Sequence, residues 1–127
     1  MHHPFAEHIA LSVVQQRAGA SRCEIQIAPH HLNPHGVVHG AVLFALADTG
    51  MGAALYPTLQ PGESCATIEL KISFLRPVVS GTLVCETTLL RRGRAVAHLE
   101  SKLTLAGELV ATASGSYAVY ARRGAGE

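Results

Sequence analysis

The chain contains no tryptophan, and aromatic residues make up only 5% of its 127 residues. Charged residues make up 15%, below the ~25% of an average soluble domain. The net charge is +1, so there is no surplus of basic residues. Because nucleic-acid binding usually requires a basic face with aromatic residues for stacking, the composition argues against a nucleic-acid partner. A small domain with so little charge favours an oligomer, in which more of its surface is covered.

No apolar run reaches the ~18–20 residues that a membrane-spanning helix requires. The stretch 40–55 comes nearest in character, but it includes Asp48 and three glycines. The N-terminus lacks the basic and then apolar pattern of a signal peptide. The three cysteines, Cys23, Cys65 and Cys85, are an odd number with no paired spacing and are expected to be buried thiols. We therefore expect a cytoplasmic protein with no membrane partner.

Apolar periodicity predicts one long helix and a set of strands. The stretch 40–55, GAVLFALADTGMGAAL, is apolar nearly all round and is expected to be a helix that is buried on most of its surface. Its small residues suggest close packing against its second half. We expect a loop at 30–38 and strands at 22–28, 67–74, 82–90, 95–105 and 109–120. A short helical turn is expected at 5–11, and a frayed tail at 121–127.

These elements predict a sheet wrapped around one helix. The four strands after the helix are expected to form an antiparallel meander with one polar and one apolar face. In 67–74 the alternation places Ile68 and Leu70 on the apolar face and Thr67 on the polar face. Only one long helix is available to cover the apolar face, and an exposed edge strand would be free to pair with a second copy. We expect one domain over 1–127, with its core at about 20–121.

Asp48 is the only ionisable residue in 40–55. Burial of an unpaired charge is costly or shifts its pKa, so this carboxylate is either a structural partner or a reagent. At the start of the helix, Gly40 and Ala41 present N–H groups that lack intrahelical partners. Such donors could stabilise a carbonyl oxygen that gains negative charge. An amide, a histidine, a helix N-terminus and a lone carboxylate so close together suggest a hydrolytic site.

The segment NPHGVVHGAVLFALADTGMGAAL, followed by ATIELKISFLRPV, resembles the hotdog-fold acyl-CoA thioesterases of the PaaI (phenylacetate-degradation) type. The family pattern is roughly Asn-x-x-Gly-x-x-His-Gly-Gly, then Leu-x-Asp, then a Thr or Ser that opens the next strand. Ala41 stands where the second glycine is usual, which could narrow the acyl pocket. The resemblance implies an α+β hotdog fold and hydrolysis of small aromatic or short- to medium-chain acyl-CoA. It also implies a homodimer or homotetramer, with no cofactor because coenzyme A is part of the substrate.

The resemblance assigns roles to single residues, and each role has a structural alternative. Asp48 would act as general base or as nucleophile. Asn33 would position water or the thioester, or it is only a turn residue before a proline. Thr67 would help to orient the nucleophile, or it is an ordinary strand residue. His39 would transfer a proton, or it is a hydrogen-bonded structural residue, and Gly36 would contribute backbone geometry to substrate binding.

Two further groups of residues, arginines and histidines, are candidates for binding coenzyme A phosphates or a metal ion. Arg76, Arg92 and Arg94 could contact the phosphates of coenzyme A, or they serve solubility. The histidines of the loop, His30, His31, His35 and His39, lack the spacing of a metal site, and we expect no metal. Two other functions stay open: an acyl-CoA hydratase or dehydratase on the same fold, and a non-catalytic acyl-CoA binding module.

Overall fold

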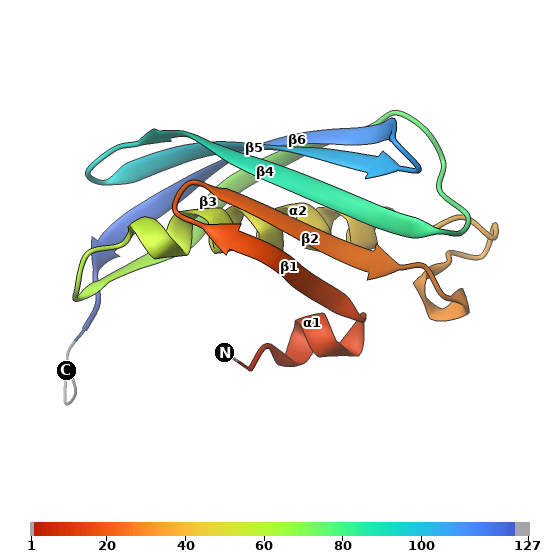
Figure 1. The fold of residues 1–127 in the computed structure, drawn as a ribbon, viewed down its shortest axis with the longest axis horizontal. Coiled ribbons are helices and arrows are strands. Elements are labelled where there is room, and N and C mark those ends of the chain that lie inside the picture. The colour runs from red at the N-terminus through yellow and green to blue at the C-terminus, as the bar shows by residue number, and fades with distance from the viewer. Residues whose placement is uncertain (1, 124–127) are drawn as a thin grey trace.

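A curved antiparallel sheet of six strands wraps around the single long helix α2 (Figure 1). The computed structural model describes residues 2–123. Its strands are β1 (Leu11–Arg17), β2 (Ala20–Gln26), β3 (Glu63–Phe74), β4 (Thr82–Arg92), β5 (Val96–Leu105) and β6 (Glu108–Ala121). The helices are α1 (Pro4–His8) and α2 (Gly40–Leu55), with 3-10 turns at Pro29–His31 and Tyr56–Thr58. This is the predicted hotdog architecture.

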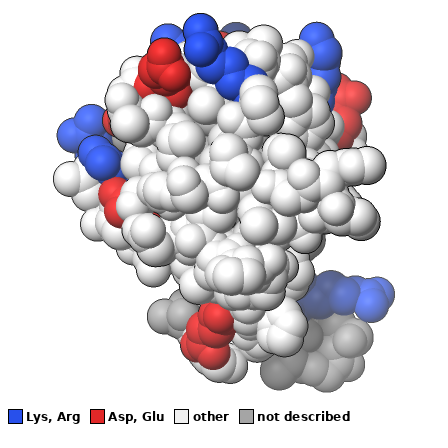
Figure 2. Space-filling model, turned by 90° about the vertical axis from the view of Figure 1, so that its right-hand side faces the viewer, with Lys and Arg blue, Asp and Glu red and all other residues white. Residues whose placement is uncertain are grey.

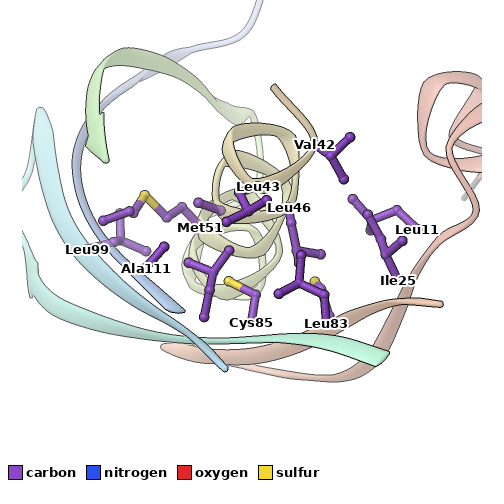
Figure 3. Packing of buried hydrophobic residues seen from close by; sticks show 14 of the residues in the cluster. Leu11, Ile25, Val42, Leu43, Leu46, Met51, Leu83, Cys85, Leu99 and Ala111 are labelled. Carbon is purple, nitrogen blue, oxygen red and sulfur yellow. The ribbon is translucent and has the colours of Figure 1, made fainter. Parts of the chain in front are cut away.

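Helix α2 spans the predicted residues 40–55 and packs against all six strands. Figure 3 shows the core between them, where Leu46 and Met51 point from the helix toward sheet residues such as Leu83 and Leu99. One side of the helix remains partly exposed. It consists of residues spaced three or four apart, namely Ala41, Phe44, Ala45, Asp48, Thr49, Gly52 and Ala53. The helix is therefore buried on most, but not all, of its surface.

The order of the strands differs from the predicted four-strand meander. Strands β4, β5 and β6 are joined by successive hairpins, as expected, but β3 pairs with β6 and not with β4. The connection 75–81 runs from β3, which lies beside β6 at one edge of this meander, to β4 at its other edge. Sequence periodicity detects a strand but not its neighbour, and this connection is longer than a tight hairpin turn. Strand β3 is consequently an edge strand.

A β-bulge in β3 breaks the predicted alternation of 67–74. Thr67 pairs with Tyr117 and Glu69 pairs with Ser116, so Ile68 is the extra residue on the bulged strand. Ile68 is 56% exposed. Because a bulge inserts one residue, Thr67 and Leu70 lie on the same face of the sheet rather than on opposite faces. The prediction that Thr67 belongs to the polar face is therefore wrong.

The N-terminal region holds a strand that the sequence did not reveal. The predicted helical turn at 5–11 is present as α1, but β1 follows it and pairs with β2. Only Leu11 of β1 is buried, so an edge strand exposed on both faces shows no apolar alternation. The predicted tail at 121–127 lies partly outside the described residues. No helix within residues 2–123 is long and apolar enough to cross a membrane.

Candidate active site

The Asp48 carboxylate lies on the partly exposed side of α2 and is hydrogen-bonded by two side chains of the sheet. Thr67 Oγ1 donates a hydrogen bond to Asp48 Oδ1 over 2.8 Å. The Tyr117 hydroxyl contacts the same oxygen and also donates to the main-chain oxygen of Asp48 over 2.8 Å. Oδ2 has no hydrogen-bond partner within residues 2–123. One oxygen of the carboxylate is therefore fixed, and the other is open to a ligand or to water.

Sequence reasoning did not identify Tyr117. The residue lies on an alternating strand and is 3% exposed, a position that a core aromatic residue normally occupies. The one available signal was its hydroxyl, because a buried tyrosine usually has a hydrogen-bond partner. Burial, and next the hydrogen bond with the Asp48 carboxylate, raise the pKa of Tyr117 well above its usual value. The hydroxyl thus stays protonated and remains a donor.

The bulge at Ile68 explains why Thr67 reaches Asp48. It places the Thr67 side chain on the inner face of the sheet, directly across from Tyr117 on β6. Close packing brings the helix within reach of both hydroxyls. A Cβ atom on Gly115, also on β6, would lie 2.6 Å from Met51 Sδ, so the glycine leaves room for the Met51 side chain between helix and sheet.

At the start of α2, one of the two expected N–H donors has a hydrogen-bond partner and the other has none within residues 2–123. The Ala41 N–H donates to Nδ1 of His39 over 2.9 Å, so His39 caps the helix and occupies that donor. The Gly40 N–H has no partner within residues 2–123. Ala41 N–H is therefore not free for a ligand, contrary to prediction, and Gly40 is the available donor. The Phe74 ring covers this point, since a Cβ atom on Gly40 would lie 3.0 Å from Phe74 Cζ.

Asn33 organises the loop that leads into α2. Its Oδ1 accepts hydrogen bonds from the backbone N–H groups of His35 (2.9 Å) and Val37 (3.2 Å). Gly36 follows with a φ of +79°, a backbone conformation that favours glycine, and its N–H donates to the Asn33 carbonyl over 3.0 Å. The turn role of Asn33 is therefore present, and its Nδ2 group is the part left to contact a ligand.

One histidine of the histidine-rich loop is buried and fully hydrogen-bonded. His31 is 2% exposed, and both of its ring nitrogens are engaged. Nδ1 accepts from the Ala28 N–H over 2.9 Å, so Nε2 donates to the Ile9 carbonyl over 2.7 Å. Among the described residues, no group of three or more His, Cys, Asp or Glu side chains is placed to hold a metal ion.

A cavity of about 350 Å³ lies beside Gly40. Its lining is mostly apolar and includes Val38, Leu43, Phe74 and Arg76. Figure 2 shows this end of the molecule, where uncharged residues cover the centre of the surface and charged residues lie toward its rim. The cavity therefore combines mostly apolar walls with a position beside the start of α2.

The three arginines predicted to contact phosphates do not form one group. Arg76 is exposed at the cavity and lies 3.7 Å from Glu108. Arg92 is at the other end of the helix, where it donates to Thr58 Oγ1 over 3.1 Å and to Glu63 over 2.8 Å. It also donates to the Gly93 carbonyl, so its guanidinium has a structural role. Arg94 is exposed in the turn just after Arg92, also distant from Arg76.

Comparison with known proteins identifies the family. A family model described as the thioesterase superfamily matches residues 35–112. A protein named "putative esterase" from Saccharolobus solfataricus is 34% identical over 109 residues, which are 84% of this chain and 76% of that protein. The chain therefore belongs to the thioesterase superfamily. The matched range includes Gly40, Asp48 and Thr67 but neither Asn33 nor Tyr117.

Two solved structures agree with the fold. One is described as a "putative thioesterase, phenylacetic acid degradation-related protein" from Ralstonia eutropha JMP134. It is 32% identical, with a TM-score of 0.86, and the match covers 93% of this chain and 91% of that one. A thioesterase from Haemophilus influenzae has a TM-score of 0.89 at 20% identity, with 97% and 87% covered. This second likeness concerns the hotdog fold alone.

Proposed function

We propose that this protein hydrolyses the thioester bond of acyl-CoA and that Asp48 is the catalytic carboxylate. The observation that carries the proposal is the state of this side chain. It is a single carboxylate at mid-helix, with Oδ1 held by Thr67 and Tyr117 and Oδ2 without a partner in residues 2–123. Membership of the thioesterase superfamily supports a hydrolytic reaction over other chemistry of a lone acid.

In the general-base form of the reaction, Asp48 Oδ2 takes a proton from water while the water oxygen bonds to the thioester carbon. The carbonyl oxygen gains the negative charge and binds to the Gly40 N–H, with Asn33 Nδ2 as a second donor. The carbon–sulfur bond then breaks, the thiolate leaves, and the proton passes to it. In the nucleophilic form, Oδ2 bonds to the carbonyl carbon and the carbon–sulfur bond breaks, which releases the thiolate and leaves an anhydride. Water then cleaves the anhydride, so that its hydroxyl goes to the acyl group, its proton to the thiolate, and the Asp48 carboxylate is restored. Both forms yield a carboxylic acid and free coenzyme A.

The spacing of Gly40 and Asp48 argues against a complete site within one chain. Asp48 lies eight residues after Gly40, which is about 12 Å along a helix. We propose that two copies share each site, with Asp48 of one facing the Asn33–Gly40 loop of the other. The partly exposed side of α2 and the adjoining edge strand β3 are the surfaces on which a second copy would pack. The proposed assembly is a homodimer or a dimer of dimers.

The size and lining of the cavity beside Gly40 support the proposal that the substrate carries a small acyl group. At about 350 Å³ with apolar walls, it suits a small aromatic or a short- to medium-chain acyl group. Arg76 at this cavity is the best placed of the three arginines for the phosphates of coenzyme A. We propose the cytoplasm as the location and no metal or other cofactor. Addition of a chelator should leave turnover unchanged.

The test is thiol release from a panel of aromatic and aliphatic acyl-CoAs by wild type and Asp48→Asn. The variant keeps the size of the side chain, so the fold and assembly should stay intact while turnover falls roughly 100-fold or more. Glu100→Gln, on the exposed face of β5, is the matched control and should keep full activity. Turnover by Asp48→Asn above about a tenth of wild type would contradict the assignment. A change in enoyl absorbance without thiol release would indicate a hydratase, and tight binding without turnover a binding module.

A further inference from the structure

The Tyr117 hydroxyl is hydrogen-bonded to Asp48, and the Thr67 hydroxyl lies beside it. The Tyr117 hydroxyl contacts the carboxylate oxygen Oδ1 and the main-chain oxygen of Asp48. A phenylalanine would fill the same space in the core, so packing alone does not require the hydroxyl. The contact joins β6 to α2 at the residue proposed to act on the substrate.

We propose that Tyr117 is a positioning residue that holds Oδ1 of Asp48 and so makes Oδ2 the oxygen that reacts. This inference rests on the proposed function of Asp48. Thr67 holds Oδ1 from the opposite strand, and together the two hydroxyls occupy the lone pairs of that oxygen. The carboxylate is then fixed in rotation, with its free oxygen directed away from the sheet.

Tyr117 suits this role because it does not itself titrate in the working range. Its raised pKa keeps the hydroxyl protonated through neutral pH, so it stays a hydrogen-bond donor to the Asp48 carboxylate. The contact with the main-chain oxygen of Asp48 adds a second restraint, because it ties the helix backbone itself to β6. The side chain and its backbone are therefore fixed by one buried group.

Tyr117→Phe removes the hydroxyl and keeps the ring. We expect kcat for thiol release to fall about tenfold or more with KM unchanged, because the reacting oxygen loses its orientation. Tyr120→Phe, on the same strand but 47% exposed, is the matched control and should change neither. A thermal unfolding curve should show that both variants are folded.

A second measurement does not depend on turnover. Asp48 is the only aspartate in the chain, so aspartate labelled with carbon-13 at the side-chain carboxyl gives a single carboxyl NMR signal. At neutral pH the chemical shift of this signal should change in Tyr117→Phe, where the carboxylate loses the hydroxyl contact, and stay in place in Tyr120→Phe. An unchanged chemical shift, with kcat within twofold of wild type, would overturn the role of Tyr117 and leave Asp48 as the catalytic group. Normal hydrolysis by Asp48→Asn would instead overturn the proposed function and the positioning role with it, even if the chemical shift changed in Tyr117→Phe.

Discussion

Gly50 of α2 lies so close to Thr87 of β4 that a Cβ atom on the glycine would be 2.8 Å from Thr87 Oγ1. Ser21 on β2 also contacts this glycine, because its Oγ donates a hydrogen bond to the Gly50 carbonyl over 2.6 Å. The Thr87 hydroxyl is in turn hydrogen-bonded to Ser101 over 2.7 Å. The second half of the helix therefore rests directly on a small buried polar cluster of the sheet, and Gly50 sets the distance between them.

Two glycine substitutions in this helix should act in opposite directions. Gly50→Ala should lower the free energy of unfolding by about 1–3 kcal/mol, because the added methyl group collides with Thr87. Gly52→Ala has no neighbour within 4 Å of the added atom in the same chain, so within one chain it should raise the free energy of unfolding by up to about 1 kcal/mol through helix propensity. Denaturant unfolding of both variants beside wild type measures the difference. Equal effects at the two positions would contradict the packing described for Gly50.

His39 should act in the structure as a helix cap rather than in proton transfer. Its Nδ1 accepts the Ala41 N–H over 2.9 Å, and an asparagine oxygen can accept the same hydrogen bond. We expect His39→Asn to keep both stability and turnover, and His39→Ala to lose about 0.5–2 kcal/mol of stability. The checks are thermal unfolding and thiol release. If His39→Asn folds normally but loses turnover, the imidazole takes part in the reaction.

The sequence predicted the parts of this molecule that depend on local pattern. Helix 40–55, its lone carboxylate and the alternation of 95–105 all appear as expected, because period and composition are properties of a single segment. Pattern does not record which strands pair, so the place of β3 at the edge was missed. A bulge leaves no mark in an alternating segment, so the position of Thr67 was missed as well. Tyr117 is far from Asp48 in sequence, and only the fold brings them together.

Substitutions of two arginines should distinguish a structural role, expected for Arg92, from a role in substrate binding, expected for Arg76. Arg92 is hydrogen-bonded to Thr58 and paired with Glu63 at 23% side-chain exposure, so Arg92→Ala should lose about 1.5–3 kcal/mol of stability with KM unchanged. Arg76 is 61% exposed at a 3.7 Å pair, so Arg76→Ala should change stability by less than about 1 kcal/mol while raising KM for acyl-CoA. Unfolding curves and steady-state kinetics on both variants test this. If Arg92→Ala raised KM and Arg76→Ala did not, coenzyme A would bind at the C-terminal end of α2, near Arg92.

The shared site makes a prediction that a site within one chain does not. Asn33→Asp keeps the oxygen that accepts from His35 and Val37 but removes the Nδ2 donor. Asp48→Asn keeps its size but removes the reacting oxygen. Each variant alone should be inactive and folded, because neither change disturbs the packing around it.

Equal amounts of the two variants, unfolded and refolded together, should regain roughly a quarter of wild-type activity. Half of the dimers formed by random mixing contain one chain of each kind. In such a dimer, one site combines the intact Asp48 with the intact Asn33 loop, and the other site has neither. Differently tagged chains allow the mixed dimer to be purified, and it should show half of the wild-type rate. An inactive mixed dimer of confirmed composition would place Asp48 and Asn33 of each site in the same chain.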